Sequence, residues 1–235
     1  MLTFGITGTD TGVGKTTVAC AMLAMLGEHG VKTAAMKPVE TGVAEGDLRS
    51  DALRLRSLAT VVHPMHVIRP YRFDPPLAPM VAAELAGNPI VDGELDRAFH
   101  RLRNSAEVTI VEGAGGALVP LAESVSMADL FRRWALDVII VAVNRLGVLN
   151  HVLLTEHELR AAGCPVVGIV LVESERADES SALNAPTLAR LTSRPLFNFP
   201  WMADPFDVCA LADAARRARL DALLPGVSPS TVVTR

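Results

Sequence analysis

The segment at 8–17, which reads GTDTGVGKTT, contains the residues with the clearest chemistry in the chain. Its glycines let backbone N–H groups converge on phosphate oxygens, the Lys15 ammonium can reach terminal phosphates, and the Thr16 hydroxyl can bind Mg2+. An apolar run precedes the segment and a helix-forming run follows, so the helix dipole would point at the same anion. Loops of this kind usually begin with glycine where this chain has Thr9, and Gly8 lies one residue too early. Even so, the segment predicts a nucleotide phosphate site.

Three charged side chains further along the chain are candidates for the same site. Lys37 directly follows a weaker strand candidate at 32–36, and Glu112 directly follows a β-branched run at 108–111. Ligands of a parallel sheet bind beyond the carboxyl ends of its strands, so a lysine there can meet an anion. Glu112 is a natural Mg2+ ligand, in a position where aspartate is commoner. Asp51 is a second candidate carboxylate, and its position equally fits the N-terminal cap of a helix.

The apolar segments predict the sheet that positions these residues. Continuous runs rich in β-branched residues occur at 108–111, 138–143 and 166–172, and weaker strand candidates occur at 2–7 and 32–36. Continuity without alternation is typical of strands buried on both faces, and therefore of a parallel sheet. Because helical segments separate the strands, the sequence predicts a doubly wound α/β fold, mainly parallel, with helices on both faces.

The spacing of apolar residues predicts two helices clearly. One covers 91–103, with Asp92 as its candidate cap, and the other covers about 207–220, with a solvated arginine-rich face. The proline-rich stretch at 69–79 is too short to link domains, so we expect an ordered loop that can cover a site. The histidines in the segment 63–66 fit a surface loop better than a metal pair, because the proline between them interrupts helical spacing.

The composition narrows the class of partner and the number of domains. The chain has 235 residues and a net charge of -4, which gives no broad attraction to nucleic acid or an anionic membrane. We expect one domain over 1–225 and a frayed tail at 226–235. Cys20, Cys164 and Cys209 are scattered in apolar surroundings, which predicts inert core thiols in a reducing compartment and no disulfide framework or zinc site. The N-terminus has no leader-like pattern, so a cytoplasmic location is expected.

Taken together, the motifs resemble the dethiobiotin synthetase family, which has a P-loop of the deviant-Walker type. The matches run in the family's order from residue 4 to about 203, so the resemblance covers nearly the whole chain. Each block alone is weak, whereas the ordered set is specific. The blocks are GTDTGVGKT at 8–16, KPV at 37–39, VEGAGG at 111–116 and LGVLNH at 146–151, with softer matches at 50–53, 70–79 and 200–202.

The resemblance implies an ATP-dependent cyclo-ligase that forms a homodimer of P-loop α/β subunits. Its substrates would be 7,8-diaminononanoate, CO2 and ATP, its cofactor Mg2+, and its product the dethiobiotin of biotin biosynthesis. One amine would first capture CO2 as a carbamate, which would attack the γ-phosphate to give a carbamic-phosphoric anhydride. The second amine would then close the ureido ring and expel phosphate.

The resemblance also implies roles for individual residues. A carbamate and a triphosphate are both anionic, so cations are needed to bring them together. The implied catalytic residues are the two lysines Lys15 and Lys37, together with Thr11. The implied nucleotide-binding residues are Gly12, Val13, Gly14, Lys15, Thr16, Thr17, Glu112, Gly115, Pro200, Trp201 and Met202. Mg2+ would be held by Thr16, Asp51 and Glu112. The substrate would contact Thr41 and a helix N-terminus that binds its carboxylate across the dimer interface, formed by Gly147, Val148, Leu149 and Asn150.

Some positions depart from the family or allow a second interpretation. Val172 stands where the family commonly has an asparagine that reads the adenine edge, so we expect looser base discrimination and use of other nucleoside triphosphates. The backbone at 200–202 would then take over this contact. The pair Asn144-Arg145 replaces a different expected polar pair, and its consequence is open. Asn150 also fits an ordinary helix cap.

Two other classes of protein share parts of this pattern. Partitioning and cell-division ATPases have the deviant P-loop, but their signature lysine belongs where this chain has Thr11. The chain also lacks the basic surface or amphipathic tail that such a switch would need. An amidoligase of the cobyrinic acid type is closer, but it would need a nucleophilic cysteine with partners, which none of the three cysteines has.

Overall fold

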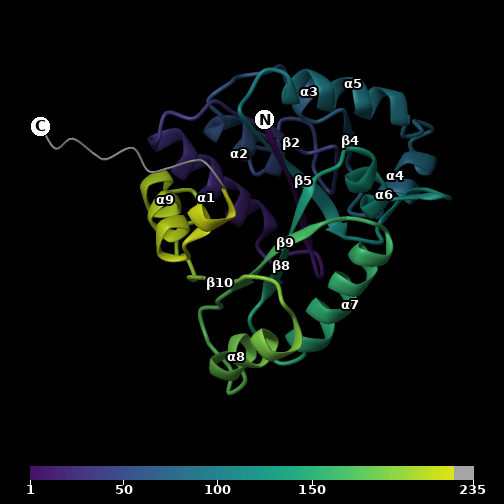
Figure 1. The fold of residues 1–235 in the computed structure, drawn as a ribbon. Coiled ribbons are helices and arrows are strands. Elements are labelled where there is room, and N and C mark those ends of the chain that lie inside the picture. The colour runs from purple at the N-terminus through teal and green to yellow at the C-terminus, as the bar shows by residue number, and fades with distance from the viewer. Residues whose placement is uncertain (225–235) are drawn as a thin grey trace, which may run out of the picture.

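A six-stranded parallel sheet forms the centre of the molecule. The computed structural model describes residues 1–224, so the predicted tail at 226–235 lies outside the described residues. The strands of the sheet are β1 (Leu2–Gly8), β2 (Thr33–Met36), β5 (Val108–Gly116), β8 (Asp137–Val143), β9 (Val166–Val172) and β10 (Leu196–Phe199). They lie in the order β10–β9–β8–β1–β5–β2 and are parallel throughout (Figure 1). This confirms the predicted α/β sheet.

The strand order fixes where a ligand can bind. The chain runs from β1 outward to β2, returns to β5 beside β1, and then continues on the other side through β8, β9 and β10. The direction of winding therefore reverses at β1. In a sheet of this kind, ligands bind beyond the carboxyl ends of the strands at such a reversal. The segment at 8–17 begins at the last residue of β1 and so lies at this point.

Helices cover both faces of the sheet, as predicted. On one face lie α1 and α9, and on the other lie α5, α6, α7 and α8 (Figure 1). The helices are α1 (Lys15–Glu28), α2 (Asp51–Leu58), α3 (Met65–Ile68), α4 (Pro79–Leu85), α5 (Asp92–Arg103), α6 (Met127–Arg133), α7 (Val148–Ala161), α8 (Ser181–Leu191) and α9 (Val208–Arg217), followed by the 3-10 helix η1 (Leu220–Leu223).

The strand side chains explain why the predicted runs are apolar without alternation. In β8, Ile139 and Val141 pack into the core that contains α1 and α9, whereas Val138, Ile140 and Ala142 pack into the core on the opposite face. Both sets of side chains are fully buried. A strand covered on both faces needs apolar residues at every position. Helix α1 is apolar around most of its surface for the same reason, because it is packed between the sheet and α9.

Two small strand pairs lie beside the main sheet. Strand β3 (Val39–Thr41) pairs with β4 (Tyr71–Phe73) in parallel, and β6 (Pro120–Ala122) pairs with β7 (Val125–Ser126) in the antiparallel sense. The stretch at 69–79 is therefore not a loop throughout, because it contains β4 and its last residue begins α4. This stretch was mispredicted because its prolines hide a strand of only three residues.

Other local predictions need correction. Asp92 is not a cap: Val91 holds the N-cap position of α5, and the Asp92 carboxylate is paired with Arg133 from α6. Cys209 is exposed, because it lies on the outer side of α9, whereas Cys20 and Cys164 are buried as predicted. Strand β10 was not predicted from the sequence. Among residues 1–224, none of the helices has both the length and the apolar character needed to cross a membrane.

Candidate nucleotide and catalytic site

A cavity of about 360 Å³ lies at the carboxyl edge of the sheet, where β1, β2, β5 and α2 meet. It brings together most of the side chains that the sequence assigned to one site. The predicted residues that line it are Thr11, Gly12, Gly14, Lys15, Thr16, Thr17, Lys37, Thr41, Asp51, Glu112 and Gly115. Val13 faces the core instead, and the segments 147–150 and 200–202 do not line this cavity.

The phosphate-binding loop needs its displaced glycine. A Cβ at Gly8 would lie 2.6 Å from the Asp10 carbonyl oxygen and 2.9 Å from the Lys15 Nζ. The loop thus folds back over the end of β1, and only glycine leaves room for it. Gly14 has φ of 96° as the residue before α1, a conformation that favours glycine. The packing of this loop therefore requires glycine at position 8, one residue before the position where the usual motif has it.

Lys15 is buried, and within residues 1–224 it has no carboxylate partner of its own. Its Nζ donates a hydrogen bond of 2.8 Å to the Asp10 carbonyl oxygen, and the residue is 6% exposed. Burial, with repulsion from Lys37 second, lowers the pKa of Lys15 to about 8. A cation held in this way gains from any anion that enters the cavity. The geometry therefore suits a nucleotide phosphate.

Lys37 has the opposite environment. Its Nζ lies 2.5 Å from the Glu112 Oε1 and 2.9 Å from the Asp51 Oδ2. Burial acts to lower the pKa of Lys37, but the charges of the two carboxylates outweigh it and raise that pKa above its usual value. Burial likewise acts to raise the pKa of Asp51, and Lys37 holds that pKa below its usual value. Lys37 is thus a fixed cation in the wall of the cavity.

The oxygens beside Lys37 fit a bound Mg2+. The Thr16 hydroxyl donates to the Glu112 Oε1 at 2.8 Å, so Thr16, Glu112 and Asp51 form one cluster around Lys37. Glu112 is 1% exposed, and burial raises its pKa. Its Oε2 has no hydrogen-bond partner among the described residues. A buried carboxylate oxygen without a partner is a costly arrangement that a hard cation with oxygen ligands would relieve.

One predicted alternative is settled by the local geometry, and the loop predicted at 63–66 needs correction because Met65 and His66 begin α3. Ser50, and not Asp51, is the N-cap of α2: its side chain accepts a hydrogen bond of 3.3 Å from the Leu53 N–H. Asp51 is free to face Lys37. In the segment 63–66, the His63 Nε2 bonds to the Ser105 Oγ at 2.8 Å. No group of three or more potential His, Cys, Asp or Glu metal ligands occurs within residues 1–224.

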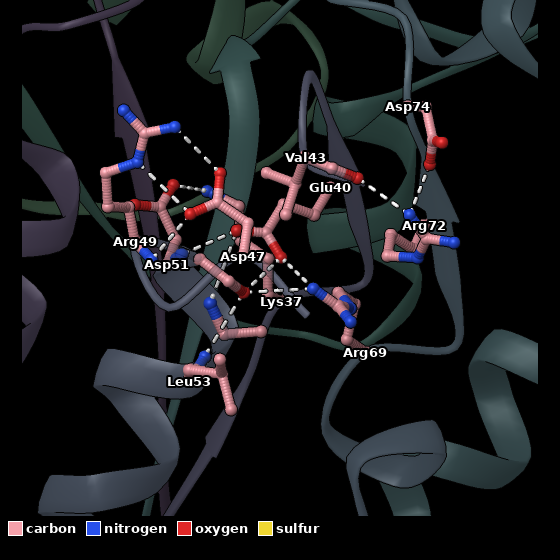
Figure 2. A network of polar contacts seen from close by, with 12 residues as sticks. Lys37, Glu40, Val43, Asp47, Arg49, Asp51, Leu53, Arg69, Arg72 and Asp74 are labelled. Atoms are coloured by element: carbon pink, nitrogen blue, oxygen red, sulfur yellow. Dashed lines mark hydrogen bonds and ion pairs between the residues drawn. The ribbon is translucent and has the colours of Figure 1, made fainter. Parts of the chain in front are cut away.

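Sequence reasoning missed Glu40 and Arg54, which also line the cavity. Glu40 lies in β3 and is 3% exposed, and dashed lines in Figure 2 connect its carboxylate to Arg69. Arg54 reaches from α2 to the segment after β10, where its Nη2 donates to the Pro205 carbonyl at 2.7 Å and its guanidinium lies 4.5 Å from the Phe206 ring centroid. The helical spacing between Asp51 and Arg54 could have indicated a shared face.

The segment at 147–150 forms the start of α7, as the sequence indicated. Gly147 holds the N-cap position with φ of 93°, and Val148 begins the helix. Asn150 is exposed in the first turn, so it is not the cap. This helix is preceded by Asn144, whose buried side chain donates to the Glu173 Oε1 at 2.9 Å and the Ser181 carbonyl at 3.0 Å. Asn144 therefore joins β8 to α8, which gives the first member of the unusual polar pair a structural role.

Val172 lies beside the phosphate-binding loop. A Cβ at Gly14 would meet the Val172 Cγ2 at 3.2 Å, so an apolar side chain packs against the end of the loop. Pro200, Trp201 and Met202 follow β10, with Trp201 46% exposed and Met202 packed against the core on the α1 side of the sheet. At the position where an amide was expected, this part of the molecule has the apolar side chain of Val172.

Comparisons with known proteins identify the family. An AAA domain family model matches residues 3–203. A relative from Anaeromyxobacter dehalogenans strain 2CP-C, named ATP-dependent dethiobiotin synthetase BioD, is 43% identical over 216 residues, which cover 91% of this chain and 92% of the relative. The chain belongs to the dethiobiotin synthetase family. Other dethiobiotin synthetases are 39% identical in Janthinobacterium sp. strain Marseille, covering 88% of this chain and 91% of the relative, and 34% identical in Salmonella typhi, covering 84% and 88%.

Two solved structures that share the fold come from another functional class. A ParA family ATPase from Chlorobium tepidum TLS has a TM-score of 0.56 at 15% identity, covering 95% of this chain and 99% of that one. The MinC:MinD cell division complex from Aquifex aeolicus gives a TM-score of 0.57 at 14% identity, covering 94% and 96%. At this identity the likeness shows only that dethiobiotin synthetases share the P-loop α/β fold with these ATPases. The family membership therefore decides against the partitioning switch.

Proposed function

We propose that this dethiobiotin synthetase closes the ureido ring of dethiobiotin from 7,8-diaminononanoate, CO2 and ATP in the cavity between Lys15 and Lys37. The observation that carries the proposal is that two lysines, 6% and 5% exposed, line one cavity at the end of a phosphate-binding loop. Two anions, the triphosphate and a carbamate, need such cations to meet. The enzyme is an ATP-dependent ligase of biotin biosynthesis.

The chemistry begins when one amine of the diamine attacks CO2 and loses a proton, which gives a carbamate. A carbamate oxygen then attacks the γ-phosphorus of ATP, and the bond to the bridging oxygen of ADP breaks. Each pair of like charges about 4 Å apart would cost roughly 4 kcal/mol at an effective dielectric of 20. Lys15 and Lys37 offset this repulsion, and Lys15 also stabilises the charge that develops on the transferred phosphoryl group.

Ring closure follows from the anhydride. The second amine attacks the carbonyl carbon, the C–O bond to the phosphate breaks, and that amine gives up a proton. One oxygen of CO2 leaves in the phosphate and the other remains as the ureido oxygen. Thr11 and Thr41, which line the cavity beside the two lysines, would orient the reacting groups.

Thr16, Asp51 and Glu112 are the residues that would hold Mg2+. Their support is the cluster of three oxygen donors and the unpartnered Glu112 Oε2. When bound, Mg2+ would supply positive charge that neutralises phosphate oxygens. The protein's own contribution is to hold these oxygens at the first turn of α1, the middle of β5 and the start of α2.

The diamine carboxylate would bind at the start of α7. The N–H groups at Gly147, Val148, Leu149 and Asn150 lie at the positive end of a helix of 14 residues, which suits a carboxylate. Because these residues do not line the cavity of the same subunit, we propose that they serve the cavity of a second subunit in a homodimer. The proposal includes a cytoplasmic enzyme whose partners are small molecules and not nucleic acid or membrane, in keeping with its net charge of -4.

The test is the dependence of ATP turnover on the organic substrate. Phosphate release would be measured with ATP and Mg2+ alone, and again after adding 7,8-diaminononanoate and bicarbonate together or singly. We expect rapid release only with both, in step with dethiobiotin detected by mass spectrometry. Phosphate release that is indifferent to the diamine would overturn the proposed function.

A further inference from the structure

Glu40 is a buried carboxylate in the cavity wall. It pairs with neither lysine of the cavity and is not among the residues proposed to hold Mg2+. Its Oε1 accepts hydrogen bonds from the Asp51 N–H at 2.5 Å and the Ala52 N–H at 3.4 Å. Its Oε2 accepts from the Ser50 hydroxyl at 2.8 Å and the Arg69 Nη1 at 2.6 Å. Every partner is a donor, and both oxygens are saturated. Glu40 therefore has no capacity left for a substrate amine.

The contacts of Glu40 converge on the first turn of α2. The first three N–H groups of a helix lack partners within the helix. Here Glu40 takes those of Asp51 and Ala52, and the Ser50 hydroxyl takes that of Leu53. A carboxylate at this end also interacts favourably with the helix dipole. Glu40, which lies in β3 and not in the helix, thereby fixes where α2 begins.

Arg69 holds the Glu40 carboxylate in place from the other side. Its side chain is 13% exposed, and its Nη1 bonds both the Glu40 Oε2 and, at 2.9 Å, the Ser50 Oγ (Figure 2). The Arg69 Nε has no hydrogen-bond partner among residues 1–224, so the guanidinium depends on these contacts. The pair links Arg69, the C-cap of α3, to β3 and to the N-cap of α2.

We infer that Glu40, held by Arg69, is a positioning residue for Asp51. The backbone N–H of Asp51 is bonded to Glu40, and its side chain is bonded to Lys37 at 2.9 Å. The residue has little freedom between these two anchors. Glu40 thus sets where the Asp51 carboxylate stands relative to Glu112 and Thr16. The inference rests on the proposed function only in giving Asp51 its role toward Mg2+.

The amide variant Glu40→Gln tests this inference. Since all four partners donate, the NH2 group of a glutamine must face either the helix N–H groups or Arg69. Nucleotide binding would be measured by calorimetry with ATP in Mg2+ and with ATP in EDTA. Substitution of a residue that hydrogen-bonds to a metal ligand typically lowers the metal affinity by about 10- to 100-fold. We expect a loss of about tenfold in the affinity for ATP with Mg2+, and binding in EDTA within about twofold of the wild type.

Further variants separate positioning from a general loss of structure. In the double variant Glu40→Gln/Arg69→Met the glutamine NH2 no longer faces a guanidinium, so the Mg2+-dependent affinity should recover in part. Glu40→Asp keeps the charge and the fold but places the carboxylate one methylene short of the α2 N–H groups, and it should also weaken binding only with Mg2+. Arg49→Ala is the matched control, because it breaks an exposed ion pair with Asp47 in the same segment, and it should bind as the wild type does.

Several results would overturn the inference. They are an equal loss of affinity with and without Mg2+ in Glu40→Gln, an unchanged Mg2+ dependence in Glu40→Asp, or wild-type ATP binding that is insensitive to Mg2+. None of these measurements uses the diamine or CO2. A wild-type enzyme that made no dethiobiotin would therefore refute the proposed function without deciding the role of Glu40.

Discussion

The two buried lysines of the cavity lie in contrasting surroundings. Lys15, at the phosphate-binding loop, bonds only a backbone carbonyl, and burial lowers its pKa to about 8. Lys37, at the end of β2, touches two carboxylates, which keep its pKa above the usual value. The charge of Lys15 is thus left for a ligand to compensate, whereas that of Lys37 is already compensated by the chain. We therefore assign nucleotide capture to Lys15, while the proposed role of Lys37 toward the carbamate rests on its place in the cavity wall.

The largest expected effect separates the two lysines by activity. Lys37→Ala should reduce dethiobiotin formation about a thousandfold, in the range found when a group that stabilises transition-state charge is removed. ATP affinity, measured by calorimetry, should change little. Lys15→Ala should instead lose most of that affinity. Lys32→Ala, at an exposed lysine outside the cavity, serves as the control and should leave both quantities unchanged. A loss of ATP binding in Lys37→Ala as large as that in Lys15→Ala would remove the distinction.

Stability should separate the lysines in a second way. Lys37→Met leaves the buried Glu112 and the partly buried Asp51 without a cation, and breaking such a pair costs about 3 kcal/mol of unfolding free energy. Lys15→Met removes a desolvated charge that has no carboxylate partner, so its unfolding free energy should stay within about 1 kcal/mol of the wild type. Urea denaturation in EDTA would measure both values. Equal destabilisation by the two variants would contradict the contrast.

The pH dependence of nucleotide binding follows from the lowered pKa of Lys15. A triphosphate binds the protonated lysine more tightly than the neutral one. Binding therefore raises the pKa of Lys15 above its value of about 8 in the protein without nucleotide. Below pH 8 this group should leave the affinity constant, and above pH 8 the affinity should fall by up to about tenfold per pH unit. Calorimetry of ATP binding between pH 7 and about 9.5 would show the decline. In Lys15→Arg, whose guanidinium stays charged, the profile should remain flat; a flat profile in the wild type would refute the assignment.

The smallest expected effect concerns the base. Val172 offers no hydrogen bond, and one neutral hydrogen bond is worth about 1 kcal/mol, so ATP and GTP should differ in affinity by less than about tenfold. Val172→Asn should increase the preference for ATP, whereas Val172→Ala should leave it unchanged. A competition assay with the two nucleotides would measure this. Strong wild-type discrimination would show that other groups read the base.

Much of the fold could be predicted because most of its central strands have a recognisable sequence pattern. The runs at 108–111, 138–143 and 166–172 are buried on both faces of the sheet, and this burial leaves an apolar signal at every position. Strand β10 carries no such signal, because it is short and Asn198 within it is exposed. The same holds for β4, whose three residues alternate between buried and half-buried positions.

The site was predictable where motif residues carry the chemistry, and less so where tertiary contacts do. Lys37 directly follows β2, Glu112 lies within β5, and Lys15 begins α1 after the loop that follows β1, so their convergence follows from the parallel sheet. Glu40 and Arg69 are 29 positions apart and meet only because β3 pairs with β4. The cap of α2 could not be assigned either, since Ser50 and Asp51 are both good capping residues. Only the ion pair of Asp51 with Lys37 distinguishes them.

The central claim, that a carbamate is phosphorylated between Lys15 and Lys37, can be tested by following one oxygen atom. The purified enzyme would be mixed rapidly with ATP, Mg2+, 7,8-diaminononanoate and bicarbonate labelled with 18O, and the released phosphate would be examined by mass spectrometry. The account predicts one 18O atom from CO2 in each phosphate and another in the ureido group of dethiobiotin. Phosphate that carries no oxygen from CO2 would contradict it.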